Sequence, residues 1–226
     1  MNITQQLAHQ LGKSIIQGKR QPLESRMTEQ TLSEEFGVSR TSVREAVKML
    51  TAKGLVTSHP REGIRVTCYT QWDLYDNSVL GWLSDSPLSA SLLAELLQLR
   101  IAVEPRAVFL ATKTQPNNFQ QFNDSLRIIQ YENTETFTSQ IFAIHSKFLQ
   151  LSQNRFFKRF RYLLGMVNNS PLMTDYYRSQ APHLVTKYEK LLTAFSDADA
   201  YRTQIEMEHI LNCELSYLQT LEPTTK

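Results

Sequence analysis

The spacing of apolar residues changes along the chain. Up to about residue 67 it has a helical period over short stretches, at about 3 to 17, at 28 to 36 and in a third stretch that begins after Ser39. Beyond residue 87 the same period runs over longer stretches, at 88 to 113, 117 to 130, 134 to 152, 154 to 170, 174 to 195 and 198 to 220. The pattern therefore predicts a mainly α protein with a small N-terminal head and a C-terminal all-helical bundle.

Turn and cap residues divide the N-terminal part into three helices. Thr28 is placed to cap the second helix, and Gly37 suits the left-handed turn that ends it. Ser39 is then placed to cap a third helix, in which four apolar residues form a buried stripe: Val43, Ala46, Val47 and Leu50. Val38, between turn and cap, is expected to enter the core.

The third helix leaves a basic, hydroxyl-rich face outside its stripe. Arg40 and Arg44 lie one turn apart, and the guanidinium fork of arginine matches O6 and N7 of guanine. The hydroxyls and backbone N–H groups at the helix start suit phosphate oxygens. Helix, glycine turn and helix of these lengths predict a helix-turn-helix, and the competing interpretation is a solvated helical face with ordinary caps. The candidate DNA contacts here are Ser39, Arg40, Thr41, Ser42 and Arg44.

Residues 54 to 67, GLVTSHPREGIRVT, have the pattern of a hairpin: a short strand, a turn with Pro, Arg and Gly, and a second alternating strand. A hairpin after a helix-turn-helix is a wing. Arg61 would lie against the narrow, negative minor groove, and Gly63 would permit close backbone approach. The alternative is a surface turn that only packs.

Charge supports a polyanionic partner for the head. Residues 1–67 hold ten Lys/Arg against six Asp/Glu, a balance of +4, whereas the remaining residues hold fourteen against sixteen, a balance of −2.

Cys68 and Cys213 are far apart and in no paired motif, which fits a reducing compartment and argues against a disulfide framework or a thiolate zinc site. No apolar run approaches the roughly 18 residues that span a bilayer, so we expect a cytoplasmic protein without a membrane segment.

These observations predict three regions. Residues 1–67 form the winged head, residues 68–87 a linker and docking segment, and residues 88–220 a helical domain for effector binding and dimerisation. Trp72 and Trp82, in the middle region, are expected to be structural anchors. Pro105 is expected to kink the first bundle helix or to split it in two.

The stretch FGVSRTSVREAVKMLTAKGLV, followed by REGIRV, closely resembles the signature of GntR-type bacterial transcription regulators. The helical part is similar, more loosely, to the FCD ligand-binding domain of the FadR subfamily: LLQLRIAVEP resembles its first helix motif and IHSKFLQLSQN its central one. The middle region resembles that of regulators of sugar-acid catabolism. The resemblance places DNA contacts on the five residues at the start of the third helix and on Gly63.

Many FCD domains hold a divalent metal through an aspartate and three histidines. His145 matches the first of those histidines, but Ile141 replaces the aspartate and Tyr188 the second histidine, while His209 lies within about one residue of the third. Two ligands rarely hold a metal. We therefore expect no metal and no cofactor, and whether a residual metal binds at His145 and His209 is left open.

Arg100 faces the cavity that the resemblance implies, and a buried arginine requires a carboxylate partner. That partner is either an anionic ligand or Glu104, one turn on. His145, Tyr188 and His209 join Arg100 as candidate effector-pocket residues, with a satisfied core side chain as the alternative for each.

The predicted function is a homodimeric regulator that binds an inverted-repeat operator in double-stranded DNA. We expect a repressor of a carbon-catabolic operon with a small organic acid as effector. Two alternatives remain: a DNA-binding dimer whose helical domain has lost ligand and metal binding, and an enzyme tethered to a DNA-binding head. No phosphate loop, nucleophile elbow or paired carboxylate motif favours an enzyme.

Overall fold

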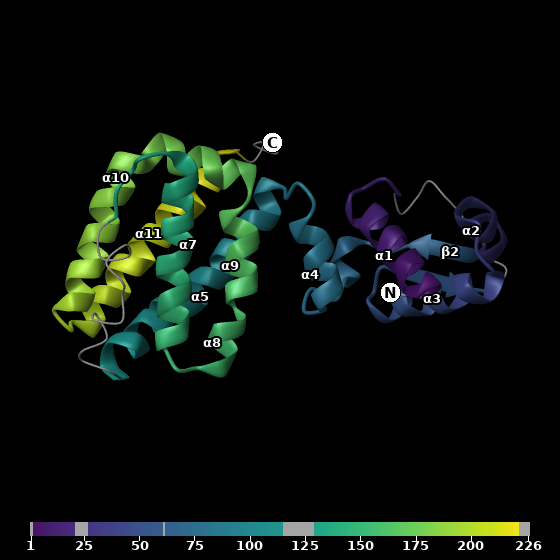
Figure 1. Cartoon of the computed structure of the whole chain (residues 1–226), viewed down its shortest axis with the longest axis horizontal. Coiled ribbons are helices and arrows are strands. Elements are labelled where there is room, and N and C mark those ends of the chain that lie inside the picture. Colours follow the sequence, from purple (N-terminus) through teal and green to yellow (C-terminus); the bar gives the residue numbers. More distant parts are fainter. Residues whose placement is uncertain (1, 21–26, 61, 115–128, 222–226) are drawn as a thin grey trace. The chain divides into compact units, whose positions relative to one another are not determined.

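The computed structural model describes residues 2–20, 27–60, 62–114 and 129–221, and within them the chain is mostly helical (Figure 1). It divides into two compact units, Met1–Pro87 and Leu88–Lys226. Among the described residues, every helix is too short or too polar to cross a membrane. The predicted fold class, a winged helix-turn-helix followed by a helical domain, is confirmed.

The first unit is built on three helices, and its caps form where the sequence predicts them. They are α1 (Ile3–Ile16), α2 (Glu29–Phe36) and α3 (Arg40–Ala52). Thr28 accepts a hydrogen bond from the backbone N–H of Thr31, and Gly37 ends α2 with φ of 64°. Because glycine has no Cβ, it adopts this left-handed conformation without steric cost. Val38 is only half-buried, so its predicted place in the core is wrong.

A two-stranded antiparallel hairpin follows α3. Strand β1 (Val56–His59) pairs with β2 (Gly63–Val66) in a register that places Val56 opposite Val66 and His59 opposite Gly63. Ile64 and Val66 are buried while Arg65 is exposed, because alternate side chains of a strand point to opposite faces. The buried stripe of α3 contributes to the same core, with Val43, Ala46, Val47 and Leu50 at most 5% exposed.

Residues 68–87 belong to the first unit. A short 3-10 helix, η1 (Tyr69–Gln71), precedes α4 (Asn77–Ser84), whose N-terminus is capped by the Asp76 carboxylate. Trp82 of α4 is buried against α1, where its indole N–H donates to His9 Nδ1 at 2.8 Å. Trp82 is therefore an anchor within this unit.

The second unit is a helical bundle. Its described helices are α5 (Ala90–Thr114), α7 (Thr134–Leu151), α8 (Arg155–Arg159), α9 (Arg161–Asn168), α10 (Pro171–Ser196) and α11 (Ala200–Leu221). Helix α5 packs against α7 and α11, and α10 packs against α11 (Figure 1). The main hydrophobic core joins α5, α7, α9, α10 and α11 through residues such as Leu97, Phe137, Phe148, Leu191 and Leu211, and a smaller second cluster includes a contact with α8.

Three helix predictions differ from the structure. Pro105 was predicted to kink the helix or to split it in two, and the split is wrong because α5 runs through Pro105: a proline removes one hydrogen bond while packing along the bundle holds the rest of the helix. The stretch at 154 to 170 forms two helices that meet at Phe160. Helix α10 begins at Pro171, where the missing N–H of proline costs nothing. The helix expected at 117 to 130 lies largely outside the described residues.

Candidate functional site

The start of α3 presents an exposed polar surface. Ser39 caps the helix by accepting from the backbone N–H of Ser42 at 3.1 Å, and the two hydroxyls lie 2.9 Å apart. Arg40, Thr41 and Arg44 are exposed, while Ser42 is partly covered. All five residues stand at the start of one helix, as predicted, because their spacing places them outside the buried stripe.

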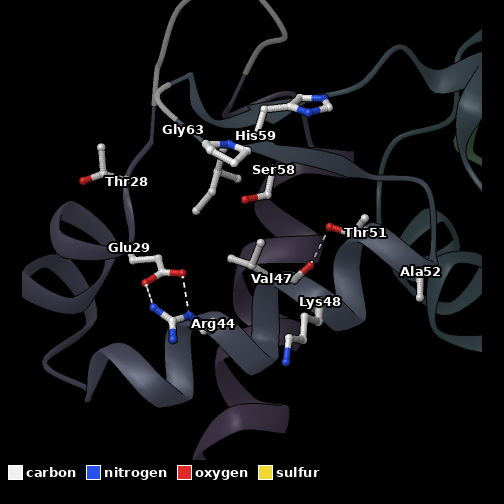
Figure 2. A pocket seen from close by; sticks show the side chains of 12 residues that line it. Thr28, Glu29, Arg44, Val47, Lys48, Thr51, Ala52, Ser58, His59 and Gly63 are labelled. Carbon is white, nitrogen blue, oxygen red and sulfur yellow. Dashed lines mark hydrogen bonds and ion pairs between the residues drawn. The ribbon is translucent and has the colours of Figure 1, made fainter.

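Arg44 forms a bidentate ion pair with Glu29, the first residue of α2. Its Nε donates to Glu29 Oε1 at 2.9 Å and its Nη2 donates to Oε2 at 2.8 Å (Figure 2). The hydrogen bond from Arg44 lowers the pKa of the Glu29 carboxyl, so Glu29 is negatively charged at neutral pH. The sequence analysis did not identify Glu29, because Glu29 and Arg44 are fifteen residues apart on two helices and the sequence pattern does not show how those helices pack.

A groove lies between α3 and the hairpin. Glu29 and Arg44 line one part of it, and Ser58, His59 and Gly63 line the part on the hairpin (Figure 2). Gly63 has φ of 81°, a conformation that favours glycine, and it stands opposite His59 in the hairpin register. Arg61, the predicted minor-groove residue, lies outside the described residues. The groove also includes Thr28, Val47, Lys48, Thr51, Ala52, Pro60 and Ile64.

The second unit contains a buried ionic cluster centred on Arg100. This arginine is 0% exposed, and its Nη1 donates to Glu214 Oε2 at 2.9 Å. Its Nε donates to Glu104 Oε1, and its Nη2 lies 3.4 Å from Glu104 Oε2. The structure therefore pairs Arg100 with Glu104, as one prediction had it, and also with Glu214 of α11, which sequence reasoning missed.

His145 and Tyr188 complete this cluster with Tyr177. His145 Nδ1 contacts Glu104 Oε2, and its Nε2 lies 2.6 Å from the hydroxyl of Tyr188. The hydroxyl of Tyr177 donates to Glu214 Oε1 at 3.3 Å. Three of the four predicted pocket residues, Arg100, His145 and Tyr188, thus lie together, each bonded to side chains of the protein itself.

The two carboxyl groups of the cluster respond differently to burial. Burial raises the pKa of Glu104, but the neighbouring Arg100 and His145 outweigh it and lower that pKa to about 2. Burial raises the pKa of Glu214, and Arg100 offsets only part of this effect. Burial also raises the pKa of Tyr177 and Tyr188 well above the ordinary range, so both phenols are neutral.

His209 does not join the cluster. It is exposed on α11, whose buried face carries Thr203, Met207, Ile210 and Glu214. Each residue turns an α-helix by about 100°, so a shift of one position directs a side chain away from the core. The placement of His209 beside Arg100 is therefore wrong. Glu214 is the residue of α11 that reaches the arginine.

No group of three His, Cys, Asp or Glu side chains suited to a metal occurs within the part of the chain that the structure describes. Ile141, where the resemblance implies an aspartate, is fully buried in the hydrophobic core. Tyr188 donates or accepts through its hydroxyl rather than through an imidazole nitrogen.

Comparison with known proteins relates the two units to regulators. Residues 3–66 match the family of bacterial regulatory proteins called the gntR family. The uncharacterized HTH-type transcriptional regulator YieP of Escherichia coli is 41% identical over 110 residues, which are 49% of this chain and 48% of YieP, so the match covers about half the length of that relative. The galactonate operon transcriptional repressor of Escherichia coli is 25% identical over 88% of this chain and 89% of its own.

A solved structure shares the fold of the whole chain. The structure of Lar, described as controlling the expression of the Listeria monocytogenes agr system, aligns with a TM-score of 0.61 at 15% identity, over 98% of this chain and 99% of that one. The matched family and the two relatives are described as transcriptional regulators, which favours a regulator over an enzyme tethered to a DNA-binding head.

Proposed function

We propose that this chain, whose residues 3–66 match the gntR family of bacterial regulatory proteins, regulates transcription by binding double-stranded DNA through α3 and the hairpin. The observation that carries the proposal is the start of α3, where Arg40, Arg44 and the hydroxyl residues Ser39 and Thr41 are exposed and Ser42 is partly covered, beside the groove that Gly63 lines. A helix with this face fits the major groove, and the hairpin fits the adjacent backbone or minor groove. Arg61 would reach that minor groove from the wing.

We propose further that the protein acts as a homodimer on an inverted repeat. A single winged head makes few base contacts, and two heads related by a two-fold axis multiply the discrimination between sites. Residues 88–220 would form the dimer and residues 68–87 would connect it to the head. Because bacterial DNA lies in the cytoplasm, this function places the protein there.

The proposed effector is a small organic acid that binds near Arg100 and relieves repression of a carbon-catabolic operon. The galactonate repressor, with 89% of its length aligned, supports a repressor of this kind, as does the resemblance of the bundle to FCD domains of the FadR subfamily. An acid at Arg100 would have to displace Glu104 or Glu214, since both carboxylates already bind the guanidinium. His145 and Tyr188 would then supply hydrogen bonds to the ligand.

A second candidate follows from the same cluster. Arg100, Glu104, His145 and Glu214 are each at most 1% exposed, and all are bonded to one another or to tyrosines. In this second candidate function, the carboxylates of Glu104 and Glu214 take the place of an anionic effector. The bundle then serves dimerisation alone, and DNA binding is independent of any acid.

The DNA-binding proposal is tested with Arg44→Ala. Duplexes that the wild-type protein selects from a random library are measured by fluorescence anisotropy, with Arg178→Ala as the control because Arg178 is exposed on α10 and its removal changes the net charge equally. We expect Arg44→Ala to weaken specific binding by tenfold or more, and Arg178→Ala to have no such effect. Undiminished specific binding by Arg44→Ala would contradict the assignment of α3.

The effector proposal is tested by thermal shift against a panel of sugar acids and other small carboxylic acids. A ligand that binds only the folded protein raises the Tm in proportion to its occupancy. We expect an effector to raise the Tm of the wild-type protein and to lower its affinity for the selected duplex. Absence of both effects with every acid of the panel supports the closed cluster instead.

A further inference from the structure

The ion pair between Glu29 and Arg44 uses one particular edge of the guanidinium. Nε and Nη2 both donate to the carboxylate, which is the side-on arrangement. This leaves the two N–H bonds of Nη1 and the outer N–H of Nη2 without a bond to Glu29, and one N–H of Nη1 together with the outer N–H of Nη2 forms the end-on edge of the fork. Figure 2 shows the nitrogen that makes no bond to Glu29 on the side of the guanidinium away from the carboxylate.

The free edge has the geometry that a guanine requires. Two parallel N–H donors match O6 and N7 of guanine in the major groove, and a bidentate contact of this kind is specific for that base. An arginine side chain that is already fixed loses less conformational freedom on binding than one that is mobile. The pairing with Glu29 therefore leaves the edge that reads a base available and holds the rest of the side chain in place.

A carboxylate in this position also affects binding to any duplex. Glu29 is charged, and 34% of its side chain is exposed in the groove beside α3. Its place at the first position of α2 is favoured by the dipole of that helix, so the local structure tolerates the charge there. The phosphates of any duplex repel the charge of Glu29. This repulsion weakens binding to sequences in which Arg44 gains no hydrogen bonds to a base.

We propose that Glu29 is a positioning residue that holds Arg44 side-on, so that Arg44 reads one guanine in each half-site end-on and binding to other sequences is disfavoured. The inference rests on the proposed function, in which α3 enters the major groove. It adds a determinant of specificity that lies outside the recognition helix. It also predicts a base identity, guanine, in a site whose sequence is otherwise open.

The alternative is that the pair only fastens α2 to α3. A structural role of that kind alters stability but not base preference. Glu29→Gln retains an oxygen acceptor without the charge, and Glu29→Ala removes both. Glu34→Gln is the matched control, because Glu34 is exposed on the same helix, hydrogen-bonds to Gln30 and carries the same charge.

The experiment is in vitro selection from a random duplex library with the full chain of each variant, followed by anisotropy on the selected duplex and on a scrambled one. We expect the preference for one guanine per half-site to fall on the order of tenfold in Glu29→Ala and less in Glu29→Gln. Binding to the scrambled duplex should tighten in both. Glu34→Gln should leave the base preference unchanged.

Two outcomes separate this inference from the proposed function. If Glu29→Ala and Glu29→Gln select the wild-type sequence with unchanged preference while Arg44→Ala loses one guanine, the positioning role is overturned and the DNA-binding assignment stands. If Arg44→Ala also retains every preference, the assignment of α3 itself fails. Thermal unfolding of each variant identifies any that is merely unfolded.

Discussion

Arg100 Nη1 and Glu214 Oε2 lie 2.9 Å apart in the core of the helical unit, although the two residues are separated by 114 positions in the chain. Neither side chain is exposed. Removing one partner of a buried pair leaves an uncompensated charge in a medium of low polarity, which costs more than the pair contributes. The connection between α5 and α11 thus depends on a charge balance as well as on apolar packing.

Arg100→Met tests this balance. We expect the variant to lose about 3–5 kcal/mol of the free energy of unfolding, because Glu104 and Glu214 lose their shared cation. Adding Glu214→Gln removes one of the stranded charges, so the double variant should be less destabilised than the sum of the single ones. Urea unfolding followed by circular dichroism measures all three, and strict additivity would show that the groups are not coupled.

Acid should destabilise the helical unit through Glu104. Its pKa is lowered from 4.5 to about 2 in the folded protein, so its contribution is complete above the unfolded value and is lost as pH falls from about 4.5 to about 2. A shift of this size corresponds to about 3 kcal/mol. Because Glu104→Gln cannot release a proton, its stability should fall less steeply through that window than that of the wild type.

The pH dependence of stability that Glu214 contributes is opposite in sign to that of Glu104. Burial raises its pKa above 4.5, so the folded state holds the proton more tightly than the unfolded chain and stability declines as pH rises from about 4.5 toward the folded value. Glu214→Gln mimics the protonated form and should remove this decline. Unfolding curves recorded across pH separate the two carboxyl groups, and parallel profiles for both variants would contradict the assignment.

Local signals in the sequence predicted the head well. Thr28, Gly37 and Ser39 act within three or four residues of their own positions, and the structure places all three in the roles that their residue types predict. Such caps depend on backbone geometry that neighbouring residues determine. The stripe of α3 was equally predictable, since helical period alone separates buried from exposed positions.

The relationships that the sequence did not reveal all cross between elements. Glu29 meets Arg44 and Glu214 meets Arg100 only after helices pack, and no periodicity reports which charge faces which. His209 shows a second reason for a wrong prediction, because a resemblance aligned only to within one residue does not determine the direction of a helical side chain. Pro105 shows a third reason, since packing along α5 keeps the helix continuous although proline disfavours a helix interior.

Gly12 is predicted to be essential for the contact between α1 and α4. A Cβ at this position would lie 2.5 Å from a ring carbon of Trp82, and the ring is held by its hydrogen bond to His9. Gly12→Ala should therefore cost about 1–3 kcal/mol through overpacking. The matched control is Gly165→Ala in α9, where the added Cβ would meet Phe142 at an ordinary 3.6 Å.

Gly165→Ala should be neutral or stabilising by up to about 1 kcal/mol, because alanine favours a helix interior over glycine. Thermal unfolding compares the two variants, and tryptophan fluorescence reports whether Trp82 moves. Equal stability of Gly12→Ala and the wild type would mean that α4 shifts away from α1 without cost.

Gly54 is predicted to tolerate substitution far less than Gly37, although both have positive φ, 74° and 64°. Alanine at either position adopts a left-handed conformation that costs roughly 1–2 kcal/mol. At Gly37 the added Cβ meets nothing within 4 Å, so that cost is the whole effect. At Gly54 it would lie 2.0 Å from the backbone oxygen of Gln71, which must move, and we expect a loss clearly larger than at Gly37. Comparing the Tm of Gly54→Ala with that of Gly37→Ala measures the difference, and equal losses would show that the segment around Gln71 yields without resistance.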